Sequence, residues 1–358
     1  MTSNKPQPRR RVESPTPRPQ PSSPVGDAAP KPYKMVSLPA PAPKRDKPVG
    51  QEKFKSDRLS GKIPLRLTVK TAAFIASGVV AMGSDISSQM RNIPLIKTSV
   101  ERDRRLIIPG SSLKGVIRST YEAITISCLC KTKADRTTIP NGYGECRDKN
   151  SLCPACQVFG ALDWQGLIRF PDAVATETKP SAGFMPSLYA PRPKRQDYYL
   201  NGKVAGRKFY YHTIRAIDQG KNKGLAVQQA GGEFVFTTEL HFMNLTQPEV
   251  GTLLIVLGQD KPNNPIALKV GGGKPIGMGT MEVGEIQDIE LLRSREDWRD
   301  RYSNYQSNPQ SLTGAKLQQF VREAIQAAHR QLVQAKQIQE LREVLGWPTD
   351  REPPEGMY

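Results

Sequence analysis

The five cysteines of the chain all lie between residues 128 and 156, and this cluster constrains the fold more than any other feature of the sequence. Cys153 and Cys156 form a C-x2-C motif with further cysteines upstream, which is the pattern of a tetrahedral zinc site. The expected ligands are Cys130, Cys146, Cys153 and Cys156. Cys128 is the alternative to Cys130, which is favoured because it is nearer in sequence to the other three.

Residues 131–152, which contain only one of these cysteines, are rich in Gly, Asp and Asn and poor in apolar side chains. Such a segment cannot fold around a core of its own, and a metal ion would hold it together. We therefore expect residues 128–156 to be a zinc-stabilised insertion with a closed, structural site rather than a catalytic one. Clustered cysteines in odd number also fit a reducing compartment better than a disulfide framework. Free thiols in a loop are the alternative.

The charge of the chain narrows the class of partner. Lys and Arg number 52 against 34 for Asp and Glu, which gives a formal net charge of +18. An excess of this size favours a polyanionic partner, most simply a nucleic acid. No stretch approaches the roughly 18 unbroken apolar residues of a membrane span, and the N-terminus lacks the apolar core of a secretory signal. We therefore expect a cytoplasmic protein without membrane contact.

Residues 1–60 are predicted to be a disordered tail, because they are basic, rich in Pro and poor in apolar side chains. The tail is either a solvated linker or a segment that orders on RNA or on a partner subunit.

Apolar periodicity predicts alternating strands and helices downstream of the tail. Residues 63–69 and 233–242 alternate between apolar and polar side chains, as half-buried strands do. Helical spacing is found at 113–124, at 247–257 and over a long amphipathic stretch at 315–345. The expected fold class is α+β, with a ferredoxin-like, split βαβ core.

The expected domain boundaries follow from these elements. Residues 61–288 are predicted to form the main domain, and residues 289–358 a C-terminal extension built on one long helix. Within the main domain, residues 174–208 show little periodicity and are predicted to be a long excursion from the core.

Residues 108–118 predict a strand, a tight turn and the start of a helix that Ser111 or Ser112 caps. Backbone N–H groups, the two hydroxyls and Lys114 would meet at this helix start, which is a favourable place for a phosphate group. The spacing is not that of a Walker A loop. An ordinary capped helix is the alternative.

A second glycine-rich element covers residues 271–279 and contains Gly272, Gly273 and Lys274. Glycines lack a Cβ atom, so another backbone can approach the main chain closely, and Lys274 adds a positive charge there. A flexible hairpin turn is the alternative.

Two further sites are candidates for RNA chemistry. Arg207 and Lys208 precede three aromatic residues, a mixture that binds phosphates and stacks on bases, although a strand with a basic solvent face is the alternative. Asp85 follows a Gly-Ser pair and could orient a metal-bound water or a ribose hydroxyl, although a solvated loop carboxylate is the alternative.

Four motifs in order resemble those of a known family. They are I-P-G-S-S-L-K-G from Ile108, C-P-A-C-Q-V-F-G from Cys153, G-L-I-R-F-P-D-A from Gly166 and the glycine-rich loop 271–279. Together they resemble the RAMP superfamily of CRISPR-associated proteins, and more narrowly the backbone subunits of type III effector complexes. The segment 207–212 is similar to members of the type III-D branch.

The resemblance implies a ferredoxin-like, RRM-derived core that binds guide RNA by shape and phosphate and leaves sequence to base pairing. It implies that Lys114, Arg118 and Lys274 contact guide phosphates, and it makes residues 174–208 the candidate for a thumb that displaces a nucleotide. The implied partners are the guide RNA, complementary target RNA, other RAMP subunits and the large subunit of the complex.

The resemblance also places Asp85 where active members carry the carboxylate for target-RNA cleavage with Mg²⁺ or another divalent metal. Arg91 and Lys97 would then contact the target strand. A non-catalytic architectural subunit is the main alternative. A guide-RNA processing endoribonuclease is disfavoured because such enzymes often rely on an early histidine, and the first here is His212. A zinc-containing ribosome- or DNA-associated protein would leave the two glycine-rich elements without explanation.

Overall fold

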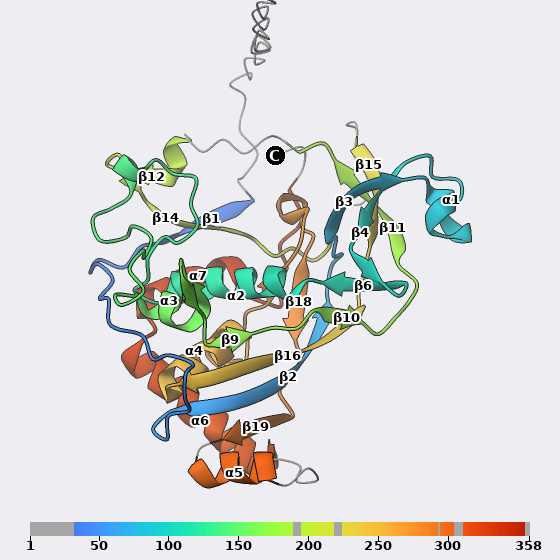
Figure 1. The fold of residues 1–358 in the computed structure, drawn as a ribbon. Helices are drawn as coiled ribbons and strands as arrows, with labels where there is room; N and C mark the ends of the chain where they lie inside the picture. The colour runs from blue at the N-terminus through green and yellow to red at the C-terminus, as the bar shows by residue number, and fades with distance from the viewer. Residues whose placement is uncertain (1–31, 189–194, 218–223, 293, 304–310, 355–358) are drawn as a thin grey trace, which may run out of the picture.

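The computed structural model describes residues 32–188, 195–217, 224–292, 294–303 and 311–354. The protein is a mixed α/β fold built on one large, curled antiparallel sheet, with helices packed beside it and smaller sheets at its upper rim (Figure 1). In this part of the chain no helix is long and apolar enough to cross a bilayer.

Two long strands form the centre of the large sheet. β2 (Leu59–Val69) and β16 (Val235–Leu245) pair antiparallel along most of their length, from Thr68 opposite Val235 to Leu59 opposite Leu245. Their alternate side chains are buried in the main core, as the period-2 pattern predicted. Both predicted strands are therefore confirmed.

The other strands of this sheet extend it in both directions. On the β2 side lie β18 (Thr280–Val283) and β17 (Leu268–Lys269), and on the β16 side lie β10 (Ala173–Ala175), β6 (Arg105–Ile108) and β5 (Glu101–Arg102). β9 (Ile168–Arg169) also pairs with β16, and β19 (Asp288–Leu292) joins β2 to β20 (Ser311–Thr313). The extension expected to begin at residue 289 thus starts inside the sheet.

A second sheet has the order β11 (Ser181–Pro186), β15 (Gly224–Gln229), β4 (Ile96–Ser99) and β3 (Ala76–Ala81). Three strand pairs form separate ribbons, which are β1 (Tyr33–Ser37) with β14 (Gly206–Tyr210), β12 (Tyr199–Leu200) with β13 (Lys203–Val204), and β7 (Gly160–Ala161) with β8 (Trp164–Gln165). The excursion predicted at 174–208 therefore contains β11 and the β12–β13 hairpin, and its residues 189–194 lie outside the described part.

The helices pack against one another and against the large sheet. The main ones are α2 (Gly110–Ile124), α4 (Gln247–Val256), α6 (Gly314–Gln331) and α7 (Ala335–Leu345), and shorter ones are α1 (Gly83–Ile86), α3 (Pro154–Phe159) and α5 (Arg295–Ser303). α4 contacts both α2 and α6, and α2 contacts α7. The predicted helix at 247–257 is confirmed, and it begins with a capping box between Thr246 and Glu249.

The single C-terminal helix expected at 315–345 is wrong, because the chain turns between Gln331 and Ala335. The apolar faces of the two halves have different partners, since α6 packs on α4 whereas α7 packs on α2 and β1. The backbone N–H of Gln334, in the turn, donates to the carbonyl of Ile124 at the end of α2 over 2.8 Å. The break lets each half bury its own apolar stripe.

The disordered tail expected for residues 1–60 is also wrong from residue 32 onward. β1 pairs with β14 over five residues, from Tyr33 opposite Tyr210 to Ser37 opposite Gly206. The segment has few apolar residues, and its order comes from backbone hydrogen bonds to the rest of the chain together with the burial of Tyr33 and Val36.

Candidate functional site

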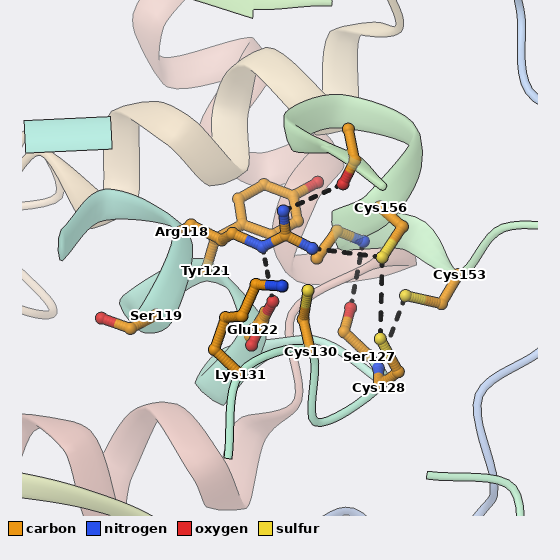
Figure 2. Close-up of polar contacts among 12 residues, drawn as sticks. Arg118, Ser119, Tyr121, Glu122, Ser127, Cys128, Cys130, Lys131, Cys153 and Cys156 are labelled. Atoms are coloured by element: carbon orange, nitrogen blue, oxygen red, sulfur yellow. Dashed lines mark hydrogen bonds and ion pairs between the residues drawn. The ribbon is translucent and has the colours of Figure 1, made fainter. Parts of the chain in front are cut away.

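The four-cysteine cluster consists of Cys128, Cys146, Cys153 and Cys156, whose sulfur atoms all lie within 4.8 Å of one another. Cys128 follows the end of α2, Cys153 is the N-cap of α3 and Cys156 lies within α3 (Figure 2). A tetrahedral zinc ion with Zn–S bonds of about 2.3 Å places its sulfurs roughly 3.8 Å apart. The sulfurs of Cys128 and Cys156 are 3.6 Å apart, and all four cysteines are buried. The cluster could therefore hold a metal ion.

The structure groups Cys128, and not the favoured Cys130, with the other three. The Cys130 sulfur lies 3.9 Å from a carboxylate oxygen of Glu145, which is a less suitable neighbour for a thiolate ligand. Nearness in sequence was a poor guide, because two cysteines only two residues apart have different neighbours in the fold.

Crowding of the sulfurs perturbs their protonation. A hydrogen bond from Cys128 lowers the pKa of Cys146 to about 7, and Cys128 also lowers the pKa of Cys153. The pKa values of Cys128 and Cys156 are raised by thiol hydrogen bonds to their neighbours. Four thiols this close cannot all ionise without a cation, and a bound divalent metal supplies the positive charge that lets them do so.

The protein surrounds the sulfurs with N–H donors. The backbone N–H of Cys128 donates to Cys153 Sγ and that of Cys153 to Cys146 Sγ, each over 3.4 Å. Arg118 Nη2 donates to Cys156 Sγ over 3.2 Å (Figure 2). Such donors stabilise thiolates and orient ligands around a metal. The donor set thus fits a thiolate-bound metal that cross-links α2, α3 and the loop before α3.

Arg118 and Arg207, both expected to contact RNA phosphates, are instead part of this buried centre. Arg118 Nε donates to Glu122 over 2.7 Å and Arg118 Nη1 to the Gly160 carbonyl over 2.9 Å. Arg207 is only 9% exposed. Its Nη2 donates to the carbonyls of Ser127 and Cys128 over 2.9 and 2.7 Å, and its Nε lies 3.7 Å from Glu122. The two guanidinium groups therefore interact with groups of the protein itself, which are Glu122, backbone carbonyls and the Cys156 sulfur.

The N-terminus of α2 differs from the expected serine-capped helix. Pro109 is the N-cap residue, no side-chain cap is formed by Ser111 or Ser112, and both serines are exposed in the first turn. The Gly110 N–H donates to Asp172 Oδ1 over 2.9 Å. A carboxylate of the protein therefore already occupies part of the place predicted for a phosphate.

Lys114 lies one turn into α2 and donates from Nζ to the carbonyl of Ile168 over 2.9 Å. Burial, together with the charge of Arg118, lowers the pKa of Lys114. No ion pair between Lys114 and a carboxylate is formed within the described residues.

The glycine-rich loop 271–279 packs against the protein's own backbone. The Gly272 N–H donates to the Phe74 carbonyl over 2.8 Å and the Gly279 N–H to the Ala72 carbonyl over 2.6 Å. Gly273 has a φ of 65°, and a Cβ there would lie 2.4 Å from the sulfur of Met278. The close approach that these glycines allow is thus an approach of two segments of the same chain.

Two lysines sit under and within this loop. Lys269 is 5% exposed and donates from Nζ to the Gly277 carbonyl and to Thr280 Oγ1, each over 3.2 Å. Burial, and next the charge of Lys274, lowers the pKa of Lys269 to about 7. The pKa of Lys274 is also lowered by burial. Neither forms an ion pair with a carboxylate in the part of the chain that the structure describes.

A cavity of about 210 Å³ opens beside the same loop. Its lining mixes aromatic and aliphatic side chains with Lys70, Arg215 and Gln229. Thr71, which also lines it, donates to the Gly277 carbonyl over 3.0 Å, so the loop borders the cavity. Gln229 Oε1 is buried and has no hydrogen-bond partner among the described residues.

Lys208, the remaining predicted RNA contact, is surrounded by tyrosines. Its Nζ lies 4.1 Å from the ring centre of Tyr33, 5.2 Å from that of Tyr198 and 4.6 Å from that of Tyr210, and it donates to the Tyr198 hydroxyl over 2.9 Å. These cation–π contacts fasten β1 to β14.

Asp85 is exposed on the short helix α1, between β3 and β4, and accepts a hydrogen bond from the Ser84 hydroxyl over 3.3 Å. Arg91 is exposed nearby in sequence and Lys97 lies on β4. Among the described residues, the cysteine cluster is the one group of three or more metal-ligating side chains, so Asp85 belongs to no such group.

Several residues of these sites were not predicted from sequence. Glu122 could have been found, since it follows Arg118 at the i+4 spacing of a helical ion pair. Lys269 stands in an apolar run, which indicates an inward-facing lysine. Nothing local points to Asp172 as the partner of Gly110, because that contact depends on the fold.

The fold and sites define a mixed α/β protein with a large antiparallel sheet, a cysteine-bound insertion and buried lysines at a glycine-rich loop. The family model of the RAMP superfamily matches residues 66–282, and the chain belongs to this superfamily. No curated protein matches it.

One similar solved structure is described as the type III-B Cmr-beta complex bound to cognate target RNA. The matched chain has 14% sequence identity and a TM-score of 0.32. The match covers 66% of this chain and 61% of the other, so this chain spans less than two-thirds of its length.

Proposed function

We propose that this protein is an RNA-binding backbone subunit of a type III CRISPR ribonucleoprotein, close to the III-D branch. Membership of the RAMP superfamily supports the class of protein. The observation that carries RNA binding is the pair Lys269 and Lys274 at the glycine-rich loop. Both are desolvated, both have lowered pKa values, and no described carboxylate pairs with either.

The distribution of ion pairs supports this position for the RNA backbone. On the open face of the large sheet Lys62 is neutralised, since it lies 3.6 Å from Glu239 and 3.5 Å from Glu290. Burial disfavours the charged form of both lysines, and a phosphate group beside them would stabilise it. We infer that guide RNA passes the glycine-rich loop and the cavity beside it, with Ser111, Ser112 and Lys114 as further contacts.

The core is assigned as ferredoxin-like. In chain order, and with other elements inserted between them, β2, α2, β10, β16, α4 and β18 give the sequence strand, helix, strand, strand, helix and strand. The sheet order β18-β2-β16-β10 supports the assignment. The segment 174–208 remains our candidate for the thumb. The partners would be guide RNA, complementary target RNA, other RAMP subunits and the large subunit, in the cytoplasm.

We also infer that the four-cysteine cluster binds Zn²⁺ as a structural ion. Four thiolates in a closed, buried site are the usual zinc ligand set. The ion would cross-link the insertion and take no part in RNA chemistry.

RNA binding is tested with the full-length protein and fluorescently labelled single-stranded RNA. Lys274→Ala should weaken binding about fivefold for any RNA sequence and reduce the salt dependence by about one ion. Lys316→Ala removes a charge from the exposed face of α6 and serves as the control. Equal affinities for Lys274→Ala and wild type would exclude the glycine-rich loop as the binding site.

A second candidate activity is metal-dependent cleavage of target RNA at Asp85. Its exposure supports this role, because a cation there would be reachable by RNA oxygens, which would have to complete its coordination. In the reconstituted complex with guide RNA, target RNA and Mg²⁺, Asp85→Ala should abolish one cleavage product at unchanged RNA binding. Asp57→Ala, another exposed carboxylate, is the control. If the cleavage products of Asp85→Ala equal those of wild type, cleavage at Asp85 is excluded and only the architectural role remains.

A further inference from the structure

The segment that precedes β2 is attached to the cysteine insertion at three points beyond the β1–β14 pairing. We call residues 33–50 the strap. The Tyr143 hydroxyl lies 2.6 and 2.9 Å from the carbonyls of Pro39 and Pro41. Arg45 Nη2 donates to the carbonyls of Gly142 and Gly144 over 3.1 and 2.7 Å.

The third attachment is a two-way backbone pair between Asp46 and Leu152. The Asp46 N–H donates to the Leu152 carbonyl over 3.1 Å, and the Leu152 N–H donates to the Asp46 carbonyl over 2.9 Å. Leu152 directly precedes Cys153, and Tyr143 is three residues before Cys146. All three attachments therefore end on a stretch that the cysteine cluster holds at both ends.

The other end of the strap reaches the same cluster through Arg207. This residue lies on β14, opposite Val36 of β1, and donates to the Ser127 and Cys128 carbonyls. Glu122 connects Arg207 to Arg118, which donates to the Cys156 sulfur. β1 is thus linked through Arg207 to Cys128 and, by way of Glu122 and Arg118, to Cys156. Figure 2 shows the last part of this path, from Glu122 through Arg118 to Cys156.

The positive charges of Arg118 and Arg207 complement the negative charge that the cysteine cluster would have with a metal ion bound. A divalent cation bound by four thiolates has a net charge of −2, and the two guanidinium groups lie beside it, with Glu122 between them. With protonated thiols, the same two guanidinium groups would share one carboxylate in a buried site, which is unfavourable.

We propose that Arg118 and Arg207, joined by Glu122, are positioning residues of the cysteine centre, and that metal bound there fixes the strap to the body of the protein. The proposal rests on the inferred Zn²⁺ site and not on RNA binding. It gives the centre a second role, which is to hold the strap against the cysteine insertion.

The first test uses hydrogen–deuterium exchange of the full-length protein before and after removal of metal with a chelator. Peptides from the strap and from 140–152 should exchange at least tenfold faster without metal and recover when Zn²⁺ is added back. Peptides from β16 are the internal control. A strap that stays equally protected after verified metal loss would overturn the coupling, and so would a protein that binds no Zn²⁺.

The second test separates positioning from simple packing. Arg118→Lys and Arg207→Lys keep the charge but lose the forked contacts, so release of Zn²⁺ to a chelating dye should accelerate about tenfold. Arg66→Lys, on the exposed face of β2, is the matched control. Release rates and strap exchange equal to those of the control would refute the positioning role. If the lysine variants do not fold, the chelation experiment on wild type still decides the coupling. RNA affinity, measured in parallel, reports on the proposed function independently.

Discussion

Arg118 donates a hydrogen bond to the sulfur of Cys156 over 3.2 Å, in the interior of a protein whose strong basic charge points to nucleic acid. This contact shows why net charge identifies a class of partner and not the residues that bind it. Arg118 and Arg207, two basic residues expected to bind RNA, instead contact Glu122 and the residues of the cysteine cluster. The lysines with no carboxylate partner are better candidates for RNA contacts, because their charge has no described counterpart within the protein.

The identity of the fourth cysteine gives a direct prediction. Cys128→Ser should reduce bound zinc from about one ion per chain and lower the thermal midpoint by several degrees, because metal binding contributes to folding. Cys130→Ser should keep the zinc, since this sulfur lies outside the cluster. Metal analysis by mass spectrometry and a thermal melt measure both. Loss of zinc from the Cys130 variant alone would reverse the assignment.

Glu122, which is 6% exposed, lies between the guanidinium groups of the buried Arg207 and the half-buried Arg118. Burial raises the pKa of Glu122, while Arg207 and then Arg118 oppose the shift. Glu122→Gln should lower the free energy of unfolding by about 3 kcal/mol, because it leaves the buried Arg207 and the half-buried Arg118 without the carboxylate that lies between them. Glu323→Gln, on the exposed side of α6, should change it by less than about 0.5 kcal/mol. Urea denaturation compares the two, and equal midpoints would contradict the role given to Glu122.

The periodicity of apolar residues predicted the strands and helices that bury one side of the element in the core. β2, β16 and α4 have regular apolar spacing, and each lies close to its expected position. The break between α6 and α7 was not predicted, because the apolar period continues across it and only tertiary partners distinguish the halves. β1 was not predicted, because it has only five residues within a Pro-rich segment and shows no regular alternation of apolar and polar side chains.

In the candidate sites too, features that depend on local sequence were predicted and features that depend on tertiary contacts were not. The C-x2-C motif located the cysteine centre, since ligand spacing along the chain is short-range information. The choice between Cys128 and Cys130, and the inward orientation of Arg118 and Arg207, depend on how α2, α3 and β14 meet. Such contacts join residues far apart in the chain, and side-chain type alone does not determine them.

Lys269 predicts a pH dependence of stability. Its pKa is lowered from 10.5 to about 7 in the folded protein, mainly by burial. Between about pH 7 and pH 10.5 the unfolded chain therefore binds a proton that the folded chain does not, so this lysine makes stability rise with pH in that window. Lys269→Met removes the effect.

Chemical denaturation of both proteins at pH 7 and pH 9.5 measures this effect. The stability of wild type relative to Lys269→Met should increase between the two pH values, because other titrating groups cancel in the comparison. A constant or decreasing difference would show that Lys269 keeps its charge when folded.

The Asp172 carboxylate at the N-terminus of α2 predicts opposite effects on stability and on RNA binding. It accepts from the Gly110 N–H and lies where a phosphate would profit from the helix dipole. Asp172→Asn keeps an oxygen acceptor but removes the charge, so the free energy of unfolding should fall by only about 0.5 kcal/mol. RNA affinity should rise severalfold at low salt, because a repulsive charge beside Ser111 and Ser112 is lost, and the gain should shrink at high salt. Asp163→Asn, in the turn between β7 and β8, controls for the change in net charge. If both variants gain affinity equally, the effect is general electrostatics and the start of α2 is not an RNA contact.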